Sequence, residues 1–261
     1  MTENATSMHR QVKAKVDLSW LVKIFFSPRQ TIEKILKFDR AVWLAPLLVL
    51  SITALILVLV TGSVKQRIGL DNPAQLPQYF EYYSPEQQAQ FMQALQATSG
   101  TAFVYVLPGL LSLAKVWFGW LIVGSLVYMM LTALGSGIHS RSAINLVAWA
   151  SMPFALRDLV RALAVLSTGQ LIRSPGLAGF TPAGSGNALL FFSALLALID
   201  IYWVWQVVLI TIGAYSESKG SKGKTAAGIV GTMLIILLLQ ALIGFGIALL
   251  GSRITAVQVF F

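Results

Sequence analysis

The feature that most constrains this chain is the length of its uncharged apolar runs. Val42–Val60 and Ala226–Leu250 contain no Asp, Glu, Lys or Arg. A helix needs about 20 apolar residues to cross roughly 30 Å of hydrocarbon, so both runs predict transmembrane helices. Only 11% of the residues are charged, against about 25% in an ordinary soluble domain. This composition argues against a soluble enzyme, a disordered chain and a nucleic-acid-binding domain.

Three further segments are long and apolar enough to be spans, although each carries charge. Phe103–Leu134 contains Lys115, Ala143–Leu166 contains three charged residues, and Ala188–Ala214 contains Asp200. We therefore predict an all-α fold, a polytopic membrane helical bundle of five transmembrane helices.

The second predicted span is too long for one perpendicular crossing. Its 32 residues would cover about 48 Å as a helix. We expect Val116–Leu134 to cross the bilayer and Phe103–Ala114 to pack elsewhere, which places Lys115 at the outer interface. A continuous and steeply tilted helix is the alternative.

Lysine and arginine are distributed unevenly between the predicted loops. With the N-terminus inside, the inner segments hold twelve of these residues and the outer segments hold four. Cytoplasmic loops are enriched in basic residues, so the bias predicts a cytoplasmic N-terminus and an outer C-terminus. The same rule explains the formal net charge of +9 without a nucleic-acid partner.

The chain divides into four parts by composition. Residues 1–16 form a polar N-terminal tail, and residues 17–41 predict amphipathic cytoplasmic interfacial helices. Residues 42–250 form the five-span membrane domain, which includes an outer helical segment at 72–102. Residues 251–261 are expected to be a short outer C-terminal tail.

A helical apolar face precedes the first span. Ser27 predicts a helix start, because Pro28 fits the first turn without losing a hydrogen bond and Gln30 completes a capping box. Basic amphipathic helices next to a span are expected to lie on the inner membrane surface, in contact with lipid. Docking of a cytoplasmic partner is the alternative. The residues of this face are Trp20, Leu21, Ile24, Phe25, Pro28, Ile32 and Ile35.

Charged side chains inside the predicted spans give the strongest physical signal. Arg157 and Asp200 each lie about 21 Å from the inner end of their spans, where an isolated charge costs at least about 2.5–3.5 kcal/mol. We expect Arg157 to pair with Asp200, and Asp158 to pair with Arg161 one turn later. The network, with Lys115 nearby, is interpreted either as a structural ion-pair staple or as a pathway for a substrate, a proton or a lipid headgroup.

A proline and several small residues add two predictions about packing. Pro153 is expected to break the third span and to free backbone carbonyls that hydrogen-bond Arg157. Small residues four apart let a neighbouring helix approach closely. In the fifth span these pairs are Ala227 with Gly231 and Gly244 with Ala248.

Groups that could perform catalysis are scarce. The chain has no cysteine, and its two histidines, His9 and His139, lie far apart. No Ser-His pair, matched aspartate dyad or metal-ligand pattern lies within the predicted spans. We therefore predict that the protein is not an enzyme and binds neither a metal nor a cofactor.

Several short motifs follow one another along the chain. They are Phe26-Ser27-Pro28-Arg29, Trp43 with Pro46, Ala150-Ser151-Met152-Pro153, Leu198-Ile199-Asp200-Ile201-Tyr202-Trp203-Val204-Trp205, then Leu209 and Ile212-Gly213, and a Lys-containing turn at 219–224. This order resembles that of the Ypt-interacting-protein (Yip) family over about residues 20–250.

The resemblance implies five spans with a cytoplasmic N-terminus. The short N-terminal tail is similar to that of the bacterial branch, some members of which resemble partners of ABC-type exporters. A position in the bacterial cytoplasmic membrane and a role as an assembly or regulatory subunit of an exporter permease are therefore implied. The family carries over no catalytic residues.

Three functions remain open at this stage. The first is an accessory or scaffold protein that contacts membrane lipids and an exporter permease. The second is a carrier or lipid-handling protein that uses Arg157, Asp158 and Asp200. The third is a homo-oligomer that shapes the bilayer.

Overall fold

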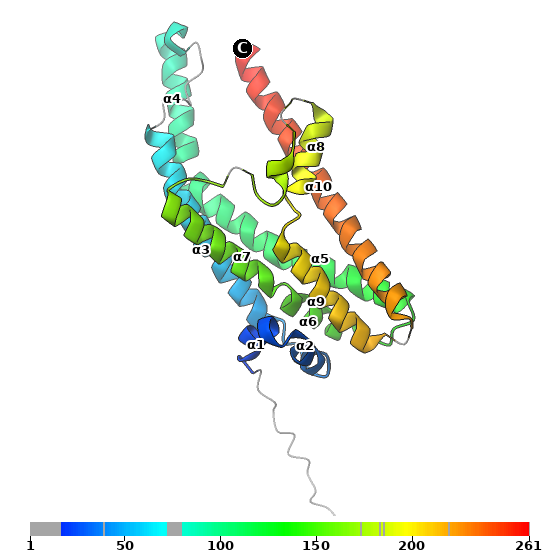
Figure 1. Cartoon of the computed structure of the whole chain (residues 1–261). Helices are drawn as coiled ribbons and strands as arrows, with labels where there is room; N and C mark the ends of the chain where they lie inside the picture. Colours follow the sequence, from blue (N-terminus) through cyan, green and yellow to red (C-terminus); the bar gives the residue numbers. More distant parts are fainter. Residues whose placement is uncertain are drawn as a thin grey trace, which may run out of the picture.

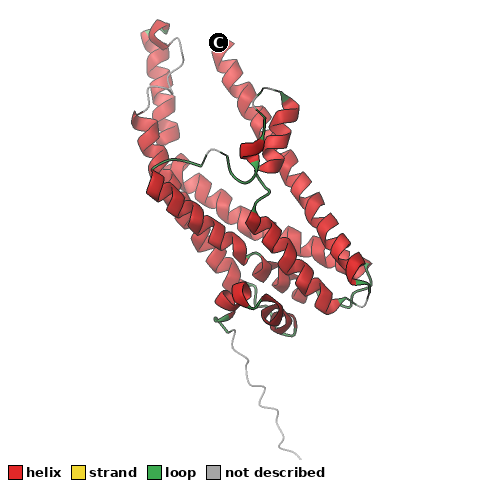
Figure 2. Ribbon diagram, viewed as in Figure 1, coloured by secondary structure: helices red, strands yellow, loops and turns green. Residues whose placement is uncertain are grey.

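The computed structural model is helical in every regular element of the residues that it describes, as the apolar runs predict (Figure 2). Those residues are 17–38, 40–71, 80–172, 174–182, 184, 186–218 and 220–260. The predicted tail at 1–16 and the first part of the outer segment, 72–79, lie outside them.

Three helices are long and apolar enough to cross a membrane. They contain the stretches Leu44–Arg67 in α3 (Leu44–Asp71), Ala102–Ala133, and Lys222–Leu250 in α10 (Lys222–Phe260). A fourth candidate is a bent pair, α8 (Asn187–Leu196) and α9 (Ile201–Glu217), whose axes differ by 59°. Five crossings and the N-in/C-out orientation stay predictions.

The second span is continuous, so the expected separation at Lys115 was wrong. A π-helical segment, η3 (Ala102–Val106), leads directly into α5 (Leu107–Ala133). Its one proline stands in the first turn of α5, where the missing N–H removes no helical hydrogen bond. No further proline follows in α5. The helix runs diagonally across the bundle (Figure 1).

The third predicted span is divided into two helices. α6 (Ser140–Ala150) ends at Ser151, and α7 (Met152–Thr168) begins with Pro153 in its first turn. This is the break that the proline predicts. α6 is buried among α2, α5 and α9, whereas α7 packs along α3. The 17 residues of α7 reach only about 25 Å, which is short for a crossing on their own.

The two N-terminal helices, α1 (Trp20–Phe26) and α2 (Pro28–Leu36), cover one end of the bundle (Figure 1). Ile24, Ile32 and Ile35 are fully buried there. The Trp20 ring contacts Trp149 of α6 at a centroid distance of 5.8 Å. The face predicted to rest on lipid is therefore packed against the protein, because the buried ends of α6 and α9 offer it a better apolar surface than the headgroup layer.

The opposite end carries shorter elements. α4 (Pro85–Ser99) stands beside the end of α3, with η2 (Phe80–Tyr82) before it (Figure 1). Its start is a reciprocal capping box. The Ser84 N–H donates to Gln87 Oε1 at 3.1 Å, and the Gln87 N–H donates to Ser84 Oγ at 3.3 Å. A further short element, η4 (Ala178–Phe180), lies in the loop before α8.

Candidate functional site

An ion-pair network joins α7 to the bend between α8 and α9. Arg157 and Arg161 are one turn apart on α7, so both side chains reach the same side of that helix. Arg157 Nη1 lies 3.7 Å from Asp200 Oδ2, and Arg161 Nη2 lies 3.3 Å from the same oxygen. The pairing of Arg157 with Asp200 expected from their matching depths is thus present in the structure.

Asp158 pairs differently from the expectation. Its Oδ1 accepts from Arg157 Nε at 3.4 Å, and the structure gives no Asp158–Arg161 pair. Arg161 turns to Asp200 instead, because Asp200 lies close to both arginines. The guanidinium of Arg157 also stacks on the Phe154 ring, with Cζ 4.4 Å from the ring centroid. Arg157 is therefore held by two carboxylates and an aromatic face.

Asp200 has a second task as the N-cap of α9. Its Oδ1 accepts the Trp203 N–H at 2.8 Å, while its Oδ2 faces the two arginines. A cap of this kind contributes about 1 kcal/mol, and removing one partner from a buried ion pair costs about 3–5 kcal/mol. Only 11% of the Asp200 side chain is exposed, so little solvent weakens these interactions.

Lys115 adds a third positive charge to the neighbourhood. Its amino group interacts electrostatically with Arg157, Asp158, Arg161 and Asp200. The side chain is exposed on α5, and it forms no ion pair with the part of the chain that the structure describes. Three cations therefore stand against two carboxylates, and the network has a net positive charge.

Two interrupted helices lie side by side at this network. α7 follows the break at Ser151, and α9 follows the bend at Asp200. Gln206 of α9 donates to Ser151 Oγ at 2.8 Å, and that hydroxyl donates to the Val147 carbonyl at 2.7 Å. The Val147 carbonyl also accepts the Ser151 N–H at 3.0 Å. Ser151 and Gln206 thus join the break to α9, whereas Arg157 pairs with carboxylates and not, as expected, with carbonyls at the break.

The residues predicted to lie at the membrane interface instead form part of the core, where α1 and α2 pack against α6 and α9. Trp20, Ile24, Ile32 and Ile35 are buried, whereas Leu21, Phe25 and Pro28 are half-buried. The Phe25 ring contacts Trp205 of α9 at 5.5 Å. These side chains therefore position α9, and three apolar neighbours in and just before α1 are exposed. Those exposed neighbours are Leu18, Val22 and Phe26.

The predicted small-residue positions of α10 fall into two groups. A Cβ added at Gly244 would contact Ala194 of α8, so this position serves packing within the chain. A Cβ added at Gly231 would meet nothing within 4 Å. Ala227 and Ala248 are exposed, so three of the four positions are not covered by this chain.

One feature near the site was missed from the sequence. The loop before α8 folds back, and the Leu177 N–H donates to the carbonyls of Leu196 at 2.9 Å and Ile199 at 3.1 Å. Those carbonyls belong to the end of α8 and to the bend. The Pro175-Gly176 pair indicates a turn, but no local signal shows which helix end that turn meets.

The side chains of the charge network do not form a set of metal ligands. No group of three or more His, Asp or Glu side chains that could hold a metal ion occurs within the described ranges. The two aspartates of the network are occupied by arginine. The arrangement can hold charge within an apolar bundle, and its excess cation can attract an anion.

The comparisons with known proteins bear on the whole bundle. A family model described as the Yip1 domain matches residues 22–252. No curated protein matches the chain, and neither does any solved structure. The matched range contains α2 to α9 and most of α10, with the network and the bend in its second half. The chain is therefore an integral membrane protein that belongs to the Yip1 domain family.

Proposed function

We propose that this protein is a non-enzymatic accessory subunit of a membrane transport complex. It binds a transmembrane helix of its partner through one line of residues on the outer side of α10, here called the α10 seam. The seam consists of Ala227, Gly231, Ile235, Leu238 and Leu242. These positions recur at intervals of three or four residues, so they lie on one side of the helix.

The observation that carries the proposal is the open space at Gly231. Cβ atoms added at two other glycines of α10 would touch other helices, since Gly228 faces Met130 of α5 and Gly244 faces Ala194 of α8, whereas Gly246 faces open space as Gly231 does. At Gly231 nothing lies within 4 Å. Small residues on a membrane helix allow close approach of a second helix, and this chain leaves that approach unused.

The permease of an ABC-type exporter is the partner class that we propose. Family membership supports this partner through one expectation, that some bacterial members resemble partners of ABC-type exporters. In this proposal the protein lies in the cytoplasmic membrane with its N-terminus inside. A bundle of apolar helices without a catalytic pattern suits assembly or regulation better than chemistry.

The test is affinity purification in mild detergent, with Gly231→Leu compared with Gly119→Leu. Both glycines face open space, but Gly119 lies on α5, away from the seam. We expect Gly231→Leu to reduce recovery of the permease about tenfold or more, since lost packing of about 1.4 kcal/mol has that effect. Gly119→Leu should retain it.

Three results would count against this function. They are recovery of the protein alone in every detergent, equal losses in both variants, and recovery of further copies of this chain instead of a permease. The last result would favour a homo-oligomer, which is the third function open from the sequence.

A second candidate, a lipid-handling carrier, is favoured by the two interrupted helices at the charge network. Broken helices near the middle of a membrane form ion and substrate sites in transporters. Arg157 and Asp200 stand where these two helices meet. In this function, an anionic lipid headgroup replaces Asp200 as the partner of Arg157 and Arg161.

Replacing Asp200 with Asn separates the carrier from a structural staple. Asn keeps the acceptor for the Trp203 N–H and removes the charge. A carrier should lose about tenfold or more of the exchange of fluorescent phosphatidylglycerol across liposomes, while circular dichroism shows that the variant remains folded. A staple should instead lose stability, by about 3–5 kcal/mol. No exchange by the unmodified protein would exclude the carrier.

A further inference from the structure

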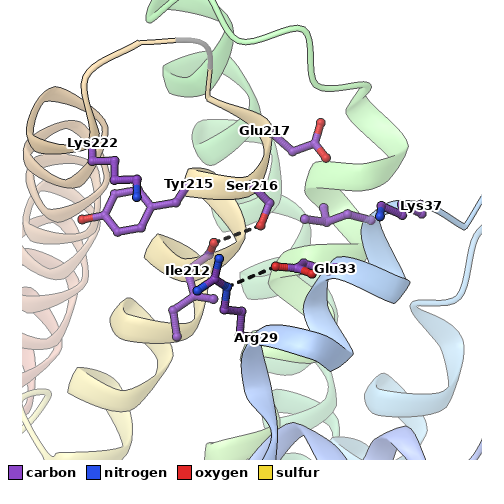
Figure 3. A pocket seen from close by; sticks show the side chains of 9 residues that line it. Arg29, Glu33, Lys37, Ile212, Tyr215, Ser216, Glu217 and Lys222 are labelled. Atoms are coloured by element: carbon purple, nitrogen blue, oxygen red, sulfur yellow. Dashed lines mark hydrogen bonds and ion pairs between the residues drawn. The ribbon is translucent and has the colours of Figure 1, made fainter.

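A charged cleft opens at the end of the bundle that carries α1 and α2. It has a volume of about 430 Å³ and lies between α2, the last turn of α9 and the first turn of α10 (Figure 3). α2 precedes the first span, whereas α9 and α10 flank the last loop, so only the folded chain brings these three elements together.

Three basic side chains line this cleft, and two of them lack an acidic partner. Arg29 pairs with Glu33 through Nε at 3.2 Å, which uses one of its five N–H donors. Neither Lys37 nor Lys222 forms an ion pair with a residue in the described part of the chain. Glu217 is the second acidic residue of the lining, so a net positive charge remains.

The cleft lies at the boundary between apolar helix and water. Lys222 is the first residue of the apolar stretch that ends at Leu250, and Glu217 is the last residue of α9. Phospholipid phosphates lie at this level of a membrane, and basic pockets between membrane helices bind anionic headgroups. Tyr215 also lines the cleft, and its exposed phenol supplies an O–H donor without charge.

We propose that this cleft binds a phosphate group through Arg29 and Lys222, with Tyr215 as the hydroxyl donor and with Lys37 on the opposite side of the cleft adding positive charge (Figure 3). A phosphate is compact and anionic, and its oxygens accept charge-assisted hydrogen bonds from several Arg and Lys side chains at once. Arg29 contributes its remaining donors while it keeps Glu33. The headgroup of an anionic lipid and a soluble phosphate ester both present this chemistry.

The test compares two double variants of the full chain purified in detergent. Lys37→Gln with Lys222→Gln removes the two unpaired charges of the cleft. Lys34→Gln with Lys224→Gln removes two charges close in sequence to these, from α2 and α10, at exposed positions that do not line the cleft. Binding of phosphatidylglycerol is measured by native mass spectrometry, and binding of glycerol 3-phosphate by calorimetry.

The cleft variant should bind phosphatidylglycerol about thirtyfold more weakly, since each basic residue near an anionic lipid contributes about a fivefold factor. The matched variant should bind it as the unmodified protein does. Tyr215→Phe, which keeps the ring and removes the hydroxyl, should give a smaller loss. Circular dichroism and the unfolding temperature confirm that each variant is folded.

The two sources of phosphate give different results. Loss of phosphatidylglycerol in the cleft variant alone identifies a lipid headgroup. Loss of glycerol 3-phosphate in that variant, with lipid binding unchanged, identifies a soluble ester. Equal losses in both double variants, or no loss in either, would overturn the proposal. These measurements need no protein partner, so they are independent of the accessory function.

Discussion

At the scale of the residue, Gly176 shows how closely the loop before α8 meets the bend. Its φ of +60° lies in the left-handed region, which a residue with a Cβ enters at a cost of about 1–2 kcal/mol. A Cβ there would also lie 2.7 Å from the Ile199 carbonyl oxygen and 2.8 Å from those of Ala197 and Leu196. Glycine therefore permits the Leu177 N–H to donate to the Leu196 and Ile199 carbonyls.

Replacing Gly176 with Ala should destabilise the protein by about 2–4 kcal/mol, because backbone strain is added to an unsatisfied helix end. Thermal unfolding in detergent measures the change. Gly179→Ala is the control in the same loop, because its Cβ would meet only Ser174, at 3.9 Å, and its φ is not positive. Equal unfolding temperatures for the two variants would contradict this account of the loop.

At the scale of the element, buried hydrogen bonds hold the start of α3 against α6. Asn145 is fully buried, and its Oδ1 accepts the Val42 N–H at 3.0 Å while its Nδ2 donates to the Arg40 carbonyl at 3.0 Å. Trp149 Nε1 donates to the Val42 carbonyl at 3.1 Å. Three backbone groups before the first span are thereby satisfied, so α3 begins at a fixed place on the bundle.

Asn145→Ala should lower the free energy of unfolding by about 2–4 kcal/mol, because the Val42 N–H and the Arg40 carbonyl each lose a buried partner. Chemical or thermal unfolding of the purified protein measures it. Ser142→Ala on the same helix is the comparison, since its hydroxyl reaches the Leu36 carbonyl only at 3.5 Å and should matter little. A larger loss at Ser142 than at Asn145 would refute this ranking.

The sequence predicts elements better than it predicts their bends and partners. The uncharged runs in α3 and α10 suffice to place those helices, because length and apolarity decide a span. Pro153 likewise predicts the break before α7. The 59° bend before α9 was missed, because Asp200 caps a new helix start there and a distant loop supplies the donor for the carbonyls before it. The apolar periodicity of α1 and α2 was read correctly, but it does not reveal what covers them.

At the scale of the whole molecule, the number of membrane crossings fixes the side of the membrane on which each loop lies. The structure offers three long spans and one bent pair, and the positive charges favour an inner N-terminus. Whether α6 and α7 together count as a crossing decides the side on which the loop after α7 lies. That loop begins at Gly169.

Single cysteines can settle this count, because the chain contains none of its own. Gln90→Cys on α4 and Gln170→Cys after α7 should react with an impermeant maleimide added to intact cells. Lys34→Cys on α2 should react only after permeabilisation. All three side chains are exposed. Reaction of Gln170→Cys from the same side as Lys34→Cys would contradict the five-span topology.

The length of α10 has a mechanical consequence. Its 39 residues form one unbroken helix of about 58 Å, nearly twice the hydrocarbon thickness of about 30 Å. A helix of this length cannot lie wholly within the hydrocarbon layer when it is perpendicular to the membrane, so either it is tilted or its C-terminal end extends into water. Lys222 borders the cleft in the first turn of α10. Because the helix has no break, a displacement of that turn moves the end of α10 on the opposite side of the bilayer as well.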